Sequence, residues 1–243
     1  MKFTAGKVAL LILVLVSGLS ASAQQNAIKV TPIRLLGRQL HLGYERALTD
    51  KMSVGLSGMT FFPFQFDDGT IANANLNTAN TEISSGTLKG YSVTPELRFY
   101  PGSKGAMRGF HAEPFVRHYA WTLGTEGEYT DGADVSQVAT DLRLSGTGLG
   151  VSIGFQGIVG DVFVIDWFIG GGATASRVRV SGAVDGPLEE DVQAYIDDLN
   201  ASIGAVPGLG NNLIKGDAES FNFKSSFVAI PVLRTGLSIG VAF

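Results

Sequence analysis

The three histidines of the sequence, His41, His111 and His118, are its strongest candidates for acid–base chemistry. A Ser/His/acid set would need one of them beside a serine nucleophile and a carboxylate. No serine lies in a G-x-S-x-G motif, and a sequence without cysteine has no thiol nucleophile, zinc–thiolate site or disulfide. We therefore expect no enzyme activity, no catalytic residue, no metal and no cofactor, and we interpret His111 as a buried hydrogen-bonding residue.

A second set of residues suits electrostatic pairing. Seven charged residues of both signs share the inward-facing positions of the predicted strands: Glu45, Glu96, Arg98, Glu113, Arg117, Asp166 and Arg234. If the alternate, apolar residues face lipid, these charges face inward, because a lipid-facing Arg or Lys at mid-membrane costs about 2–4 kcal/mol. We interpret the set as a lumen charge network that plugs a narrow barrel, with a narrow polar conduit as the alternative.

The elements that must position these charges have a period of two residues. From Tyr91 to Phe99, apolar residues alternate with Ser92, Thr94, Glu96 and Arg98. The same alternation occurs at 52–57, 148–155 and 236–243, with one apolar face and one small, polar or charged face. This pattern predicts strands, and aromatic residues near the expected strand ends are typical of the girdles of outer-membrane barrels.

The N-terminus has the three parts of a secretory signal peptide. Lys2 and Lys7 accompany an apolar run at 8–16, and Ala21-Ser22-Ala23 is a small-residue cleavage motif. We predict a signal peptide at 1–23, cleavage after Ala23, and a mature domain at 24–243 whose formal charge changes from −4 to −6. A permanent helical anchor is the alternative, although the apolar run is shorter than the roughly 20 residues that span a bilayer.

Composition excludes two further classes of protein. With 45% apolar and 16% charged residues, the chain is too apolar for disorder and poorer in charge than soluble domains, which contain about 25%. Its net charge of −4 supplies no basic surface, so we expect no nucleic-acid partner. No apolar run after residue 23 is long enough for a spanning helix, so the mature chain can enter a membrane only as a closed barrel.

Seven strands are predicted at 39–47, 51–64, 86–100, 108–123, 138–156, 161–180 and 226–243. An eighth at 26–35, with a tight turn at Leu36-Gly37, makes the number even, as in single-chain bacterial barrels. Short turns, assigned to the periplasm, alternate with long outer loops at 67–86, 124–138 and 181–220. Gly170-Gly171-Gly172 predicts a strand bulge, and the spacing of apolar residues predicts one helix at 187–203 in the last loop.

Two regions of the sequence carry a resemblance to a known family. Residues 26–32 (NAIKVTP) leading into 42–51 (LGYERALTDK), together with 93–101 (VTPELRFYP), resemble a family of small bacterial outer-membrane β-barrel proteins of unassigned function. These look like distant relatives of the OmpA/OmpX-type eight-stranded barrels. The resemblance covers the first half of the mature chain and implies a fold and a location, with no catalytic residues. Phe243, a terminal aromatic residue after alternating apolar residues, resembles the signal that the outer-membrane assembly machinery reads.

The sequence thus predicts an all-β, closed antiparallel transmembrane β-barrel of eight strands in the bacterial outer membrane, with an envelope-structural or surface-interaction role. Expected partners are outer-membrane lipid and lipopolysaccharide, the assembly machinery at the C-terminal strand, and an extracellular partner at loop 181–225. Two alternatives belong to other classes. One is a soluble periplasmic, lipocalin-like binder of apolar ligands, which requires an apolar interior. The other is a lipid-modifying enzyme that uses His111 and Glu113.

Overall fold

The computed structural model describes residues 25–62, 64–67, 81–131, 134–185, 197, 200, 215–216, 220–224 and 228–243. The predicted signal peptide at 1–23 lies outside the described residues. Of the helix predicted at 187–203, only Asp197 and Asn200 are described. Within the described ranges, no helix has the length and apolar character needed to cross a membrane.

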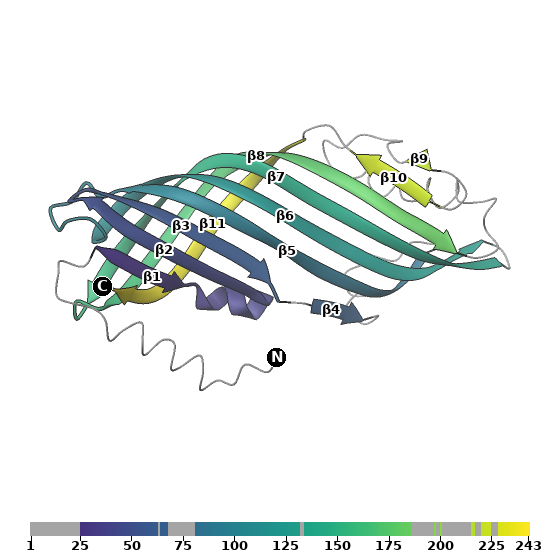
Figure 1. The fold of residues 1–243 in the computed structure, drawn as a ribbon, viewed down its shortest axis with the longest axis horizontal. Coiled ribbons are helices and arrows are strands. Elements are labelled where there is room, and N and C mark those ends of the chain that lie inside the picture. The colour runs from purple at the N-terminus through teal and green to yellow at the C-terminus, as the bar shows by residue number, and fades with distance from the viewer. Residues whose placement is uncertain are drawn as a thin grey trace.

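Eight strands form a closed ring in which each strand is antiparallel to its neighbours. They are β1 (Asn26–Val30), β2 (Gln39–Thr49), β3 (Met52–Phe61), β5 (Thr81–Phe99), β6 (Gly109–Asp131), β7 (Asp134–Val159), β8 (Phe163–Asp185) and β11 (Val228–Ala242). The ring follows chain order, and β11 closes it by pairing with both β8 and β1 (Figure 1). The predicted all-β antiparallel architecture of eight strands is confirmed.

Three shorter strands lie outside the ring. β4 (Phe64–Asp67) pairs with β5, and β10 (Ser220–Lys224) pairs with β8 and with β9 (Lys215–Gly216). On that edge of β8, β11 covers residues 163–176 and β10 covers residues 179–183.

Alternating exposure follows from the alternating sequence. Along β3, Ser53, Ser57 and Met59 are buried, whereas Val54 and Leu56 are exposed. Because successive Cβ atoms of a strand point to opposite faces, one face of each strand lines the interior of the ring and the other faces its surroundings. In this chain the interior receives small, polar and charged side chains, and the outer face receives apolar ones.

Strands β5 to β8 extend well past the ends of β1 to β3 at one end of the ring (Figure 1). β6 and β7 pair continuously from Gly109 with Gln156 to Asp131 with Asp134, so the long loop expected at 124–138 is wrong. β5 already begins inside the loop expected at 67–86, and β8 ends inside the loop expected at 181–220. These outer segments mix polar and apolar residues on both faces, so they lack the alternation that marks a strand in the sequence.

The opposite end of the ring has the short connections. Residues 50–51, 100–108 and 160–162 join strands there, and the C-terminus lies beside them (Figure 1). The two ends of the molecule therefore differ, with short turns beside the C-terminus and strand extensions at the far end.

The first strand is shorter than the 26–35 segment predicted. β1 ends at Val30, and a 3-10 helix, η1 (Pro32–Gly37), replaces the tight turn expected at Leu36-Gly37. Pro32 has no N–H for a strand ladder, and its fixed φ suits the first position of a helix. Arg38 ends η1 in the left-handed region (φ 53°) and donates its backbone N–H to Leu35 O at 3.0 Å.

The bulge expected at Gly170-Gly171-Gly172 is also wrong. β8 pairs through this segment with β7 and with β11 without a shift in register. The inward positions continue from Phe168 through the glycines to Thr174, both of which are buried. The glycines instead permit close approach, since a Cβ at Gly172 would lie 2.3 Å from the backbone oxygen of Leu149 on β7.

Candidate functional site

The interior of the ring contains a buried cluster of charged and polar side chains to which every strand of the ring contributes. We call it the lumen cluster. It consists of Lys29 on β1, Glu45 on β2, Ser53 on β3, Glu96 and Arg98 on β5, His111 and Glu113 on β6, Gln156 on β7, Asp166 on β8 and Arg234 on β11, all of which are buried.

Arg98 lies at the centre of the lumen cluster and contacts acceptors on five strands, including Glu45 Oε2 on β2 at 3.3 Å from Nη1. Its Nη1 donates to Asp166 Oδ2 at 2.7 Å and to Gln156 Oε1 at 2.8 Å. Its Nη2 donates to Glu96 Oε1 at 3.1 Å, and its Nε lies 2.6 Å from Glu113 Oε2. The planar guanidinium, with five N–H donors, suits a role in which one side chain joins several carboxylates.

Lys29 forms a second bridge across the lumen. Its Nζ lies 2.6 Å from Glu45 Oε2, 2.8 Å from Asp166 Oδ2 and 3.0 Å from Gln156 Oε1. Lys29 was not among the charges selected from the sequence, because the alternation around Pro32 is ambiguous in the first strand. Lys29 could have been identified if the strand had been predicted at 26–30. In a strand with those bounds, Lys29 lies two residues from the buried Ala27 and therefore points to the same, inward side.

Arg234 completes the set of cations from the last strand. Its Nη2 donates to Glu96 Oε2 at 2.5 Å, and its Nη1 pairs with Glu113. The guanidinium also lies over two rings, 4.5 Å from the centroid of Phe168 and 5.0 Å from that of Phe115. Cation–π contact of this kind stabilises a desolvated guanidinium.

Neutral donors occupy the carboxylate oxygens that the cations leave available. The hydroxyls of Tyr100 and Ser53 donate to Glu45 Oε1 at 2.6 and 2.5 Å. His111 Nε2 lies 3.2 Å from Asp166 Oδ1. Tyr100, Ser53 and Gln156 were not among the residues selected from the sequence, because neutral polar residues are common on the inward face and nothing in their type distinguishes these three.

Six of the seven charges selected from the sequence meet in the lumen cluster, and Arg117 does not. Arg117 is half-buried, donates from Nε to Thr94 Oγ1 at 3.2 Å, and lies 5.9 Å from the ring centroid of Phe115. The alternation of the strand correctly places the Arg117 side chain inside the ring. Alternation does not show how far along the ring axis a residue lies, and Arg117 lies at a different position along that axis from the carboxylates.

The lumen cluster fills its level of the ring. It combines three cations, Lys29, Arg98 and Arg234, with four carboxylates. Buried charges of this kind are tolerated when they are paired and hydrogen-bonded. All seven are paired here, and all but Glu113, which makes ion pairs only, also form hydrogen bonds. The cavity beside the cluster has a volume of about 10 Å³, which is close to the minimum for one water molecule.

The histidines do not form one site. His111 is fully buried in the lumen cluster, His41 Nδ1 lies 2.8 Å from Thr31 Oγ1, and His118 is exposed on the outer face with Nδ1 2.8 Å from Thr147 Oγ1. Across the described ranges, no three His, Asp or Glu side chains are arranged to hold a metal ion.

Phe243 lies at the seam where the two ends of the chain meet. Its backbone N–H donates to Asn26 O at 2.8 Å, and the Asn26 N–H donates to Phe243 O at 2.9 Å. Four residue pairs, from Ala27 with Ala242 to Val30 with Ile239, join β1 to β11. The C-terminal aromatic residue is thus part of the segment that closes the ring.

Comparison with known proteins assigns the chain to a family. A family model described as "Protein of unknown function (DUF3575)" matches residues 9–180, which is most of the chain. The chain belongs to the DUF3575 family. For this DUF3575 member, the matches give no support to the OmpA/OmpX-type relationship expected from the sequence.

Two further comparisons add little to the DUF3575 assignment. No curated protein matches the chain. The crystal structure of CarO from Acinetobacter baumannii is similar with a TM-score of 0.40 and 10% identity, over 91% of this chain and 97% of CarO. Similarity at that level supports no inference about this DUF3575 member.

Glycine at position 55 makes room for the lumen cluster. A Cβ there would lie 2.6 Å from Glu96 Cγ and 2.7 Å from Glu96 Oε1, and Glu96 is held by both Arg98 and Arg234. We expect Gly55→Ala to lower the free energy of unfolding by about 1–3 kcal/mol, because the held carboxylate cannot move aside. Urea unfolding of the refolded protein, followed by tryptophan fluorescence, measures this loss.

Gly43→Ala is the matched control for Gly55→Ala. Position 43 also faces inward, but an added Cβ would meet only Ser57 Cβ at 3.8 Å and Lys29 Cβ at 3.9 Å, which are ordinary contacts. This variant should be as stable as the wild type or slightly more so, since alanine replaces glycine in a strand. Equal losses in both variants would contradict a specific role for Gly55.

Proposed function

We propose that this chain is a non-enzymatic outer-membrane β-barrel with a plugged lumen, which stabilises the envelope or presents its extended strands for contact outside the cell. One observation carries the proposal: the polarity of the protein is inverted. Arg98 and Glu113 are 1% and 0% exposed, whereas Leu149 and Leu233 are 72% and 75% exposed. Water-soluble proteins place such residues the other way round.

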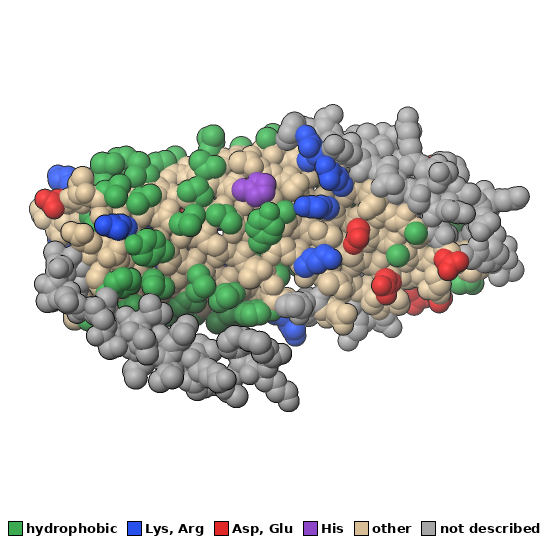
Figure 2. Space-filling view, in the orientation of Figure 1, with side chains coloured by type: hydrophobic (Ala, Val, Ile, Leu, Met, Phe, Trp, Pro, Cys, Tyr) green, Lys and Arg blue, Asp and Glu red, His purple; other side chains and the backbone are tan. Residues whose placement is uncertain are grey.

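The exposed apolar side chains form a continuous band, which we call the apolar belt. Figure 2 shows it covering the half of this face away from the acidic end. Its members include Leu42, Val54, Leu56, Tyr91, Val93, Phe110, Val116, Leu149, Val151, Ile153, Phe155, Ile165, Trp167, Ile169, Leu233, Leu237 and Ile239. A single exposed leucine needs no explanation, but a continuous apolar surface of this extent marks contact with a membrane or a partner.

The height of the apolar belt supports the membrane. On β7 the outward residues are apolar at Leu149, Val151, Ile153, Phe155 and Val159. At about 3.3 Å per residue and a strand tilt of about 40°, the segment 149–159 covers about 25 Å along the ring axis, which is the height of the apolar band of outer-membrane barrels.

The proposal that the protein is non-enzymatic is supported by the lumen cluster. His111 is 0% exposed and its Nε2 faces Asp166, so no substrate reaches it without breaking the cluster. The exposed His118 bonds to Thr147, a neutral hydroxyl. The lipocalin-like alternative is disfavoured for a related reason, because an apolar ligand requires an apolar interior and this interior holds buried charges.

The proposal includes partners at both ends of the barrel. The apolar belt would contact outer-membrane lipid, and β11, with Leu237, Ile239 and Val241 before Phe243, would be read by the assembly machinery. The extensions of β5 to β8 leave the belt and end near an acidic surface, shown in red in Figure 2. We propose these extensions as the surface for an extracellular partner; most of the 181–225 segment, where the sequence predicts such a partner, lies outside the described residues.

The proposal is tested by the gel mobility and the conductance of the protein from the outer-membrane fraction. We expect the unboiled protein to migrate differently from the boiled protein, because a closed barrel resists detergent until heated. In planar bilayers we expect no steady conductance, because the lumen cluster fills the ring. Protein found free in the periplasm without a mobility shift would overturn the membrane location, and stable open-channel currents would overturn the plugged lumen.

A further inference from the structure

Three basic residues form a row across the outer face, between the apolar belt and the far ends of the extended strands. Lys89 on β5 pairs with Thr122 on β6, Thr122 pairs with Arg143 on β7, and Arg143 pairs with Arg179 on β8. Paired residues of adjacent strands share a face, and Lys89, Arg143 and Arg179 are all exposed. We call these three residues the basic row.

The basic row includes a repulsive contact. Arg143 and Arg179 are direct cross-strand partners, which places their Cβ atoms about 5 Å apart, and like charges in this position destabilise a sheet. Among the described residues, no carboxylate forms an ion pair with either arginine. An anion bound between the two guanidinium groups would attract both of them and so offset the repulsion between them.

The level of the basic row suits one kind of anion. On β5, Tyr91 of the apolar belt lies two residues from Lys89 on the same face. Figure 2 shows the same order across this face, with an apolar half, then a band of Lys and Arg, then acidic residues at the far end. If the belt lies in the hydrocarbon region, Lys89 lies at the level of the lipid headgroups, where lipid phosphates occur. Arg143 lies six residues beyond Leu149 on β7, which is about 15 Å farther out along the ring axis, so the row runs from the edge of the belt into the layer of headgroup sugars and phosphates.

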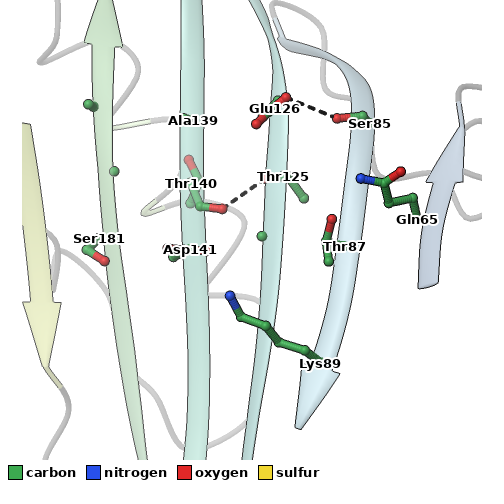
Figure 3. A pocket seen from close by; sticks show the side chains of 13 residues that line it. Gln65, Ser85, Thr87, Lys89, Thr125, Glu126, Ala139, Thr140, Asp141 and Ser181 are labelled. Atoms are coloured by element: carbon green, nitrogen blue, oxygen red, sulfur yellow. Dashed lines mark hydrogen bonds between the residues drawn. The ribbon is translucent and has the colours of Figure 1, made fainter. Parts of the chain in front are cut away.

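A polar hollow lies beside the basic row on the side away from the belt. It has a volume of about 540 Å³ and is lined mainly by hydroxyl, amide and carboxylate groups, including those of Ser85, Thr87, Glu126 and Asp141. Figure 3 shows Lys89 extending from β5 toward β7 at one border of this hollow. Carboxylates repel phosphate but accept hydrogen bonds from sugar hydroxyls, so the hollow suits a neutral sugar and the basic row suits a phosphate.

We propose that Lys89, Arg143 and Arg179 bind the phosphate groups of a phosphorylated glycolipid in the leaflet at this end of the barrel, with the sugar of the headgroup in the adjacent hollow. The inference rests on the proposed membrane location and adds a specific lipid class to it. Bidentate contacts from two arginines are the strongest protein contacts available to a phosphate. The negative charge of the bound phosphate also offsets the repulsion between the guanidinium groups of Arg143 and Arg179.

Binding is tested on the folded barrel purified in an uncharged detergent. Diphosphoryl lipid A and the same glycolipid without phosphates are the probes, and native mass spectrometry measures the bound fraction. We expect the wild type to prefer the phosphorylated lipid, and R143Q/R179Q to bind it about tenfold or more weakly, since each basic residue contributes to the attraction. Equal affinity of the wild type for the two lipids, or of the two proteins for lipid A, would overturn the proposal.

The matched control is K51Q/K104Q, which removes the same charge from exposed residues in the short connections at the opposite end. We expect this variant to bind lipid A as the wild type does. A loss of affinity equal to that of R143Q/R179Q would show that net charge alone controls binding, which would overturn the proposed site.

Millimolar inorganic phosphate should not displace lipid A from the wild type. Full displacement would show that the basic row binds free phosphate, which would overturn the lipid as its ligand. The gel-mobility shift of each variant reports folding separately, so a wild type without the shift refutes the proposed function itself.

The repulsive pair adds a second readout. In detergent without phosphorylated lipid, Arg143→Gln should leave the urea midpoint unchanged or raise it, because it removes repulsion. With lipid A present, the same substitution should lower the midpoint relative to the wild type. A lowered midpoint in both conditions would show that Arg143 stabilises the sheet itself, which contradicts the inferred role.

Discussion

Replacing Arg98 with methionine should lower the free energy of unfolding by about 3–5 kcal/mol, the cost of removing one partner from a buried charge network. The change removes the guanidinium that contacts Glu96, Glu113 and Asp166 and leaves these carboxylates with Lys29 and Arg234 as the remaining cations. Methionine keeps much of the side-chain length, so the loss reports charge pairing more than packing. Urea unfolding of the barrel refolded in lipid vesicles gives the value.

Arg117→Met is the control for Arg98→Met, because it makes the same change of charge inside the same ring. Among the described residues, Arg117 bonds only to the neutral Thr94 hydroxyl, and it lies over the Phe115 ring, outside the lumen cluster. Its replacement should cost about 1 kcal/mol, the net value of a typical hydrogen bond. Similar losses for the two variants would show that the cluster has no special part in holding the ring together.

The second large effect concerns the outer face, at Ile153. This side chain is 48% exposed near the middle of the 149–159 segment of the apolar belt, and we expect Ile153→Arg to cost about 2–4 kcal/mol when the barrel is in a bilayer. The cost arises because a guanidinium on the lipid face must lose its hydration or distort the bilayer. Measurement of unfolding in vesicles and of the yield of folded protein in the outer-membrane fraction tests this expectation.

Ala139→Arg provides the comparison for Ile153→Arg. Ala139 is exposed on the same face of the same strand, but in the extension beyond the apolar belt. An arginine there meets water and should change stability by less than about 0.5 kcal/mol. If Ile153→Arg were equally harmless, the belt would not be in contact with lipid.

The strand count and the inward placement of charge followed from alternation, and alternation depends on the surroundings of each strand. Where one face is exposed and apolar and the other lines the interior of the ring, as at 91–99, the two-residue period is clear. Beyond the belt, at 124–131, both faces lose this contrast, so the paired extensions of β6 and β7 looked like a loop. The sequence therefore predicted the strands only where their faces have different environments.

The lumen cluster could be predicted in part for a similar reason. Parity indicates which side chains point inward, and it selected Glu45, Arg98 and Asp166 correctly as inward residues that meet. Parity does not place residues of different strands at a common height, which depends on the stagger between strands. Arg117 was therefore included although it lies apart, and Lys29 was missed because η1 shortens the first strand in a way that only Pro32 signalled.

The short seam between β1 and β11 has a consequence for how the protein is made. The segments that meet there are separated by almost the whole chain, with Asn26 beside Phe243, whereas β6, β7 and β8 pair with their neighbours in sequence. Hairpins of neighbouring strands can form before the whole chain is available. The ring, however, keeps two unpaired strand edges until β11 pairs with β1. Open strand edges pair with other chains, so we expect this protein to be most prone to aggregation in the interval before the ring closes.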